Sequence, residues 1–217
     1  MGEVYFIRHG QASFGTANYD RLSPLGHQQA EWLGQYLAAT GLQFDHVITG
    51  TLRRHRETLA AMNKTLGIAS WDEDVRLNEM AYFAVERAFD SQYGDSPADT
   101  PDAMAAQFVR VMDAYEQDRI SGVPERFADF RARVLAALDD HGIEGKRVLI
   151  VSSGGPKGIV MRHTLGLDGA AMNRIILGTM NSSLSRFLNR SGTLLLSQYN
   201  AVPHLDQPER HHARTYI

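Results

Sequence analysis

Three short stretches of this sequence place Arg, His, Ser and Gly where a strand ends or a helix begins. The first is Arg8, His9 and Gly10, which follow an apolar run. A neutral imidazole there can act as a nucleophile or as a base, and the planar guanidinium beside it suits a phosphate or a carboxylate. The alternative is a histidine that caps a backbone group at a strand end, and these three residues taken alone favour that alternative.

The second stretch, residues 51–58, opens an expected helix with three arginines, Arg53, Arg54 and Arg56. Cations are disfavoured at the positive end of a helix dipole, and a bound anion would offset that repulsion. A solvated basic face is the alternative, and we expect it to hold for at least one of Arg53 and Arg56.

The third stretch, residues 152–157, has the sequence SSGGPK and follows a strand-like run. A Gly-rich turn between a strand and a helix exposes backbone N–H groups to an anion, so Ser153 and Gly154 are candidate phosphate ligands. The spacing matches neither a Walker phosphate loop nor the nucleophile turn of α/β hydrolases. A tight strand-to-helix turn explains the stretch equally well. Glu79 is a lone carboxylate with no local signal of function.

Strand-like runs and helical spacings alternate along the chain, which indicates an α/β fold with a mostly parallel sheet covered by helices. The expected strands are residues 4–7, 45–49 and 148–151, with a hairpin of 184–188 and 193–199; the expected helices are 29–37, 52–66 and 156–165. Open α/β sheets bind ligands at the carboxyl ends of their strands. Arg8, His9, Arg54 and the 152–157 turn are therefore expected to converge on one small dianion, for which phosphate is the natural candidate.

Residues 80–120 have a different composition, with eight acidic and three basic side chains and a net charge of −5. Met104, Phe108, Met112 and Tyr115 recur within them at helical spacing. We interpret the segment as a helical insertion over one edge of the sheet. Most of its aromatic residues (Tyr82, Phe83, Phe89 and Tyr93) are expected to pack in the core.

Composition excludes several classes of protein. The chain has 217 residues, 43% hydrophobic and 22% charged, which rules out a disordered or fibrous protein. It has no cysteine, which excludes disulfides, thiolate metal sites and cysteine nucleophiles. The net charge of −3 argues against nucleic acid as the main partner. No stretch approaches the ~20 apolar residues of a membrane span, and the N-terminal run is strand-like, so we expect a cytoplasmic protein with no membrane partner. The sequence does not indicate the oligomeric state.

Several stretches together resemble one family. Residues 7–11 are IRHGQ, residues 22–30 are LSPLGHQQA, residues 52–58 are LRRHRET and residues 77–79 are LNE. They resemble, in order, the opening signature of the histidine phosphatase superfamily, also called phosphoglycerate-mutase-like, and its blocks L-T-x-x-G-x-x-Q-A, L-x-R-A-x-E/Q-T and L-x-E. Residues 181–182 and 200–205 are also similar to it. The resemblance covers nearly the whole chain outside the insertion. It implies a three-layer α/β sandwich, one domain over residues 1–217 with a small helical cap inserted at about 80–125.

The resemblance also implies roles for matching residues. His9 would be the nucleophile that accepts the phosphoryl group, Arg8 and Arg54 would hold the phosphoryl oxygens, and Glu79 would be the acid that protonates the leaving oxygen. The first three roles agree with the chemistry of the residue types. The resemblance implies that no metal or other cofactor is needed.

One position departs from the family pattern. The last strand of the family usually ends S-H-G-G, and its His is a second phosphate ligand, whereas this chain has Ser153 there. A hydroxyl donates one hydrogen bond and carries no positive charge. Losing one preorganised donor typically costs about 10²–10³ in rate, so activity is expected to be reduced but not abolished. Another histidine, first of all His204, is a candidate to enter the pocket, whereas His55 is expected to be packed.

These observations predict a metal-independent phosphatase that hydrolyses phosphomonoesters, on a small molecule or a phosphoprotein, through a phosphohistidine on His9. A catalytically impaired protein that binds a phosphorylated ligand is one alternative, favoured by Ser153; the retention of Glu79 argues against it. A phosphomutase is the second alternative. The acidic cap argues against the polyanionic substrates that such an enzyme needs.

Overall fold

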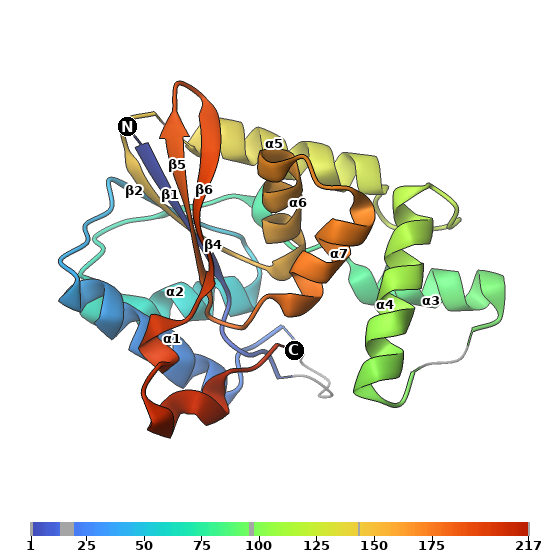
Figure 1. Cartoon of the computed structure of the whole chain (residues 1–217), viewed down its shortest axis with the longest axis horizontal. Coiled ribbons are helices and arrows are strands. Elements are labelled where there is room, and N and C mark those ends of the chain that lie inside the picture. Colours follow the sequence, from blue (N-terminus) through green and yellow to red (C-terminus); the bar gives the residue numbers. More distant parts are fainter. Residues whose placement is uncertain (1, 14–19, 96–97, 143, 217) are drawn as a thin grey trace.

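A six-stranded sheet in the order β3-β2-β4-β1-β5-β6 forms the centre of the molecule (Figure 1). The computed structural model describes residues 2–13, 20–95, 98–142 and 144–216. The strands are β1 (Gly2–Arg8), β2 (His46–Thr49), β3 (Asp72–Glu73), β4 (Arg147–Ser152), β5 (Leu184–Arg190) and β6 (Thr193–Ala201). The pairs β1–β4, β4–β2 and β2–β3 are parallel, whereas β1–β5 and β5–β6 are antiparallel. The predicted mostly parallel sheet is confirmed, and so is the predicted hairpin.

Side-chain alternation in β1 divides the core into two layers. Val4 and Phe6 belong to one apolar cluster, and Tyr5 and Ile7 belong to another on the opposite face. The second cluster includes residues of α1 (Pro24–Ala39) and α2 (Arg53–Leu66), and the first includes residues of α5 (Phe127–His141) and α6 (Gly154–Leu165). Helices therefore cover both faces of the sheet, as Figure 1 shows, and the predicted three-layer α/β sandwich is confirmed.

Local signals set the ends of the helices that carry the site. Helix α1 begins five residues before the predicted residue 29, because Ser23 caps it by accepting a hydrogen bond from the Gly26 N–H, and Pro24 fits its first turn. Helix α2 ends at Gly67, which adopts the left-handed conformation that favours glycine. Helix α6 begins at Gly154, two residues before the predicted start, so its first N–H groups lie at the carboxyl end of β4.

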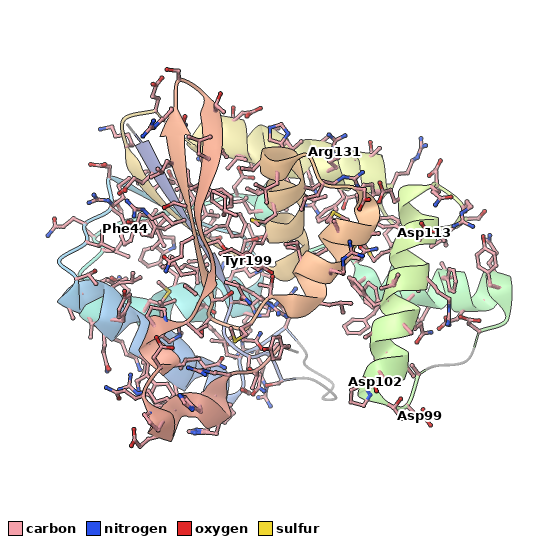
Figure 2. All side chains as sticks on the ribbon, viewed as in Figure 1. Phe44, Asp99, Asp102, Asp113, Arg131 and Tyr199 are labelled. Carbon is pink, nitrogen blue, oxygen red and sulfur yellow. The ribbon has the colours of Figure 1, made fainter. Side chains whose placement is uncertain are left out.

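Two helices, α3 (Tyr82–Tyr93) and α4 (Pro101–Glu116), lie at one end of the molecule beside α7 (Gly169–Gly178) (Figure 1). The Gln107 amide on α4 donates to the Asp90 carboxylate on α3 at 2.9 Å, and the Tyr82 and Phe108 rings lie 5.2 Å apart. Figure 2 labels Asp99, Asp102 and Asp113 on this part of the chain, and all three are exposed. Two helices thus form most of the described part of this segment, as predicted, and several of its acidic side chains are in solvent.

The remaining regular elements are short 3-10 turns: η1 (Val75–Leu77), η2 (Pro203–Leu205) and η3 (Pro208–Ala213). Turn η1 leads directly into Asn78 and Glu79. Among the described residues, no helix has both the length and the apolar character needed to cross a membrane.

Candidate active site

The predicted site residues converge at the carboxyl edge of the sheet. Arg8 at the end of β1 is paired with Ser152 at the end of β4, and the His9 N–H donates to the Ser152 carbonyl at 2.8 Å. A cavity of ≈ 650 Å³ opens at this edge. Its lining includes Arg8, His9, Arg54, Glu79 and Gly154. These residues come from the end of β1 and the position after it, the first turn of α2, the segment after η1 and the start of α6.

His9 is held as a neutral imidazole with a fixed tautomer. Its Nδ1 lies 2.7 Å from the Gly10 carbonyl oxygen, and a carbonyl only accepts, so Nδ1 carries the proton. Burial lowers the pKa of His9 well below its usual value, and the charges of Arg54 and Arg8 lower it further. The Nε2 atom therefore keeps its lone pair at neutral pH. A neutral imidazole with an unprotonated Nε2 is equipped to attack an electrophile.

The two arginines beside His9 have different partners. Arg8 donates to the Thr179 carbonyl, and Arg54 forms an ion pair with Asp20 at 2.7 Å. Arg54 belongs to the first turn of α2, and its side chain is buried. Two guanidinium groups within one cavity favour binding of a doubly charged anion.

Arg53 and Arg56 point outward on the same helix. Arg53 binds Glu57 at 2.6 Å, and Arg56 binds Glu73, both in exposed ion pairs. The expectation that at least one of Arg53 and Arg56 belongs to a solvated basic face is confirmed, and it holds for both. Only Arg54 of the three lines the cavity.

Glu79 is fixed against the start of α6. Its Oε2 accepts a hydrogen bond from the Gly155 N–H at 2.9 Å, and its Oε1 accepts from the Met80 N–H at 3.1 Å. A Cβ on Gly155 would lie 2.0 Å from Glu79 Oε1, so only glycine permits this approach. The SSGGPK turn thus positions a carboxylate, a role that its sequence did not indicate.

Ser153 is buried at the N-cap of α6, and its Oγ lies 2.6 Å from His55 Nε2. His55 is packed, as expected, with no exposed surface. His204, the expected substitute, is also buried, and its Nε2 contacts Ser182 Oγ at 2.8 Å. Ser153, His55 and His204 are not among the residues that line the cavity, whereas Gly154, directly after Ser153, is.

The histidine phosphatase superfamily model, branch 1, matches residues 4–201. The chain belongs to this family. The predicted membership is confirmed, and the enzymes of this family that the chain resembles are phosphatases or mutases.

Two curated relatives and one solved structure show the range of similarity. The serine/threonine-protein phosphatase PGAM5, mitochondrial, of Xenopus laevis is 38% identical over 65 residues, which are 29% of this chain and 24% of that protein, so the match spans about a quarter of that relative. Probable phosphoglycerate mutase GpmB of Serratia proteamaculans (strain 568) is 30% identical over 96% of this chain and 97% of that protein. A phosphoserine phosphatase from Entamoeba histolytica, in complex with phosphoserine, shares the fold with a TM-score of 0.65 at 19% identity, covering 94% of this chain and 100% of that one.

The side of the cavity that α3 and α4 form is largely apolar in this member of the family. Tyr82 and Phe83 from α3 and Met104 and Phe108 from α4 line it. The expectation that most aromatic residues of this segment pack in the core is correct for Phe89, which is buried, and for Tyr82, which packs against the core while it also lines the cavity. It is wrong for Phe83 and Tyr93, which are exposed. The helical spacing of Met104 and Phe108 was the available signal. That spacing showed a common helix face but not what the face contacts.

Sequence reasoning missed Asp20, which also lines the cavity. Within the described ranges, no group of three or more His, Cys, Asp or Glu side chains is arranged to hold a metal ion.

Proposed function

We propose that this histidine phosphatase hydrolyses phosphomonoesters through a phosphohistidine on His9, without a metal. The observation that supports this most is the state of His9. Its proton lies on Nδ1, towards Gly10, so its Nε2 keeps a lone pair, in a cavity that Arg8 and Arg54 also line.

The proposed reaction has two steps. In the first, His9 Nε2 forms a bond to phosphorus while the bond from phosphorus to the leaving oxygen breaks, and Glu79 gives that oxygen a proton. In the second, water attacks phosphorus, Glu79 takes its proton, and the N–P bond breaks to release inorganic phosphate. Arg8 and Arg54 neutralise the charge on the phosphoryl oxygens in both steps, with the Gly154 N–H and Ser153 at the start of α6 as further donors.

We infer that α3 and α4 act as a cap, inserted at about 80–125 into a single domain over residues 1–217, and that the cap selects the leaving group. The apolar side chains that it contributes to the cavity favour a phosphomonoester with an apolar or aromatic leaving group. A mutase must hold a second anionic group. Beyond Arg8 and Arg54, the charged lining residues are Asp20, Glu79, Glu86 and Arg87, which are acidic on balance. This lining favours the phosphatase over the mutase.

A second candidate function rests on Ser153, which we propose stands where the family usually has a histidine that binds phosphate. A site without that positive charge could bind a phosphorylated ligand without turning it over. Such a binder would have no use for Glu79 as an acid, and the close approach of Glu79 to Gly155 favours the enzyme.

The test is phosphate release by the purified protein from a panel of aryl and alkyl phosphomonoesters and phosphopeptides. The parent is expected to release phosphate and to form an acid-labile phosphoprotein, and His9→Ala is expected to do neither while keeping its thermal stability. His163→Ala, which removes an exposed histidine of α6, is the matched control and should keep full activity. Full turnover by His9→Ala would end the phosphohistidine hypothesis. Binding of phosphate by the parent with no turnover on any member of the panel would support the binder.

A further inference from the structure

A second imidazole lies beside His9, and the proposed reaction does not use it. His55 follows Arg54 in the first turn of α2, and its ring centroid is 5.8 Å from that of His9, with the ring planes inclined by 36°. Burial, together with the charge of Arg54, lowers the pKa of His55 well below its usual value. A neutral, fully buried histidine therefore lies next to the nucleophile.

The surroundings of His55 fix its position. On one side, Nε2 lies 2.6 Å from Ser153 Oγ. On the other side, a Cβ on Gly50 would lie 2.2 Å from Nδ1, so the ring fills space that only a glycine leaves open. The Nδ1 atom is buried and has no hydrogen-bond partner among the described residues.

These contacts favour one tautomer. A neutral imidazole has one N–H, and placing it on Nδ1 would bury a donor that has no acceptor among the described residues. Placing it on Nε2 lets it donate to Ser153 Oγ. The Ser153 oxygen is then an acceptor, and its own hydroxyl proton remains available for another partner.

Ser153 is unusual for a serine at a helix start. A serine at the N-cap normally accepts a hydrogen bond from its own helix, but the Ser153 side chain makes no such bond. It bonds to His55 instead, and the residue that follows it, Gly154, lines the cavity. Both residues also stand where the chain departs from the motifs that it resembles, with His55 in place of Ala in one block and Ser153 in place of His in another.

We propose that His55 is a positioning residue of the active site, which holds the Ser153 hydroxyl so that its proton is donated to an oxygen of the phosphoryl group on His9. The pair supplies the donor that a single histidine would otherwise provide at the start of α6. This inference rests on the proposed function, because it assigns a part of the same phosphoryl site.

The first experiment is a double-mutant cycle with His55→Ala, Ser153→Ala and the double variant, on one aryl phosphomonoester and with orthovanadate as inhibitor. Each single variant is expected to lose about 10- to 10³-fold in kcat and to bind vanadate more weakly, because a donor aimed at the transition state is lost. The kcat of the double variant should be no lower than that of the less active single variant, because the two residues act as one unit. Multiplicative losses would overturn the proposal.

Exchange of the two side chains is the second experiment. His55→Ser combined with Ser153→His keeps the same groups and moves the imidazole to the other partner. We expect it to recover at least about tenfold in kcat over each of its two single changes. Ser153→His alone should not raise kcat, because His55 already fills the space. A gain from Ser153→His alone, with no further effect of changing His55, would show that His55 does not serve the site.

His204→Ala separates a catalytic effect from a folding effect. His204 makes the same kind of contact, with Nε2 at 2.8 Å from Ser182 Oγ and an Nδ1 without a partner among the described residues. The His204→Ala variant should have a lower melting temperature than the parent but the same kcat and the same affinity for vanadate. An equal loss of kcat in His204→Ala would mean that the His55 effect reports folding. An inactive parent would count against the proposed function, whereas an active parent whose His55→Ala variant is equally active would count against this inference alone.

Discussion

Asp20 and Arg54 form an ion pair at the cavity, with Arg54 Nη1 2.7 Å from Asp20 Oδ1. The arginine side chain is 7% exposed and the aspartate side chain 39% exposed, so the carboxylate approaches from the solvent side. The same carboxylate accepts a hydrogen bond from the Arg53 N–H at 2.9 Å. The Asp20 carboxylate thus already binds one N–H group of Arg54, the arginine that we propose binds phosphate.

Removal of this carboxylate should strengthen phosphate binding. In Asp20→Ala, Arg54 loses a competing partner and the cavity loses a negative charge, so inhibition by inorganic phosphate is expected to tighten about two- to fivefold, as suits a partly exposed pair. The measurement is the inhibition constant of phosphate. Asp206→Ala breaks a more exposed ion pair with Arg214, and neither residue lines the cavity, so it should leave the inhibition constant of phosphate unchanged. Weaker phosphate binding in Asp20→Ala would show that Asp20 orients Arg54 rather than competes for it.

The role of Glu79 as an acid predicts a dependence on the leaving group. Glu79→Gln keeps the shape of the side chain but has no proton to give, so kcat for alkyl phosphates should fall about 10²–10⁴-fold. The loss should be much smaller for p-nitrophenyl phosphate, whose leaving oxygen needs no proton. The measurement is kcat across leaving groups of graded basicity.

Glu86→Gln is the matched control for that experiment, because Glu86 lines the same cavity from α3. It should leave the slope of kcat against leaving-group basicity unchanged. A uniform loss across all leaving groups in Glu79→Gln would assign Glu79 to binding rather than to proton transfer.

The apolar cap predicts which substrates are affected by its mutation. Phe108→Ala removes a ring that lines the cavity and stacks near Tyr82, so KM for naphthyl phosphate should rise about tenfold or more, through loss of buried apolar surface. KM for glycerol phosphate should change little. Val109→Ala, at the next position of α4, is the control, because Val109 is exposed and does not line the cavity. Equal increases in KM for both substrates in Phe108→Ala would show that the cap does not contact the leaving group.

The sheet and its carboxyl edge could be predicted from the sequence for physical reasons. Residues 4–7 and 148–151 are unbroken apolar runs, because both faces of a central parallel strand are covered. The hairpin was predictable because two strand-like runs flank a short turn that contains Gly192, which adopts the positive φ that favours glycine. Convergence of Arg8, His9 and Arg54 then followed from the common direction of parallel strands.

The features of the site that could not be predicted from the sequence depend on contacts between distant parts of the chain. Helices α5 and α7 were not among the predicted elements, although Phe127, Phe130 and Val134 recur at helical spacing in α5 and Asp168 caps α7. The contact of His55 with Ser153 joins residues 98 positions apart, and that of Glu79 with Gly155 joins residues 76 positions apart. Neither residue of such a pair shows its partner locally. His55 was correctly predicted to be packed. Its spacing in the sequence could not show that the place where it packs is beside His9.

Buried neutral histidines predict a loss of stability in acid. Burial, with the charge of Arg210, lowers the pKa of His204 from 6.5 to about 3. Between these values the unfolded chain binds a proton that the folded chain does not, so the free energy of unfolding falls as pH falls below 6.5. This one group should remove about 2 kcal/mol between pH 7 and pH 5. The His204→Gln variant should lack this contribution to the decrease in the free energy of unfolding. Its urea midpoints at pH 7 and pH 5 should therefore differ less than those of the parent. His163→Gln removes an exposed histidine and should keep the parental difference. A parental difference retained in His204→Gln would mean that His204 is protonated in the folded protein.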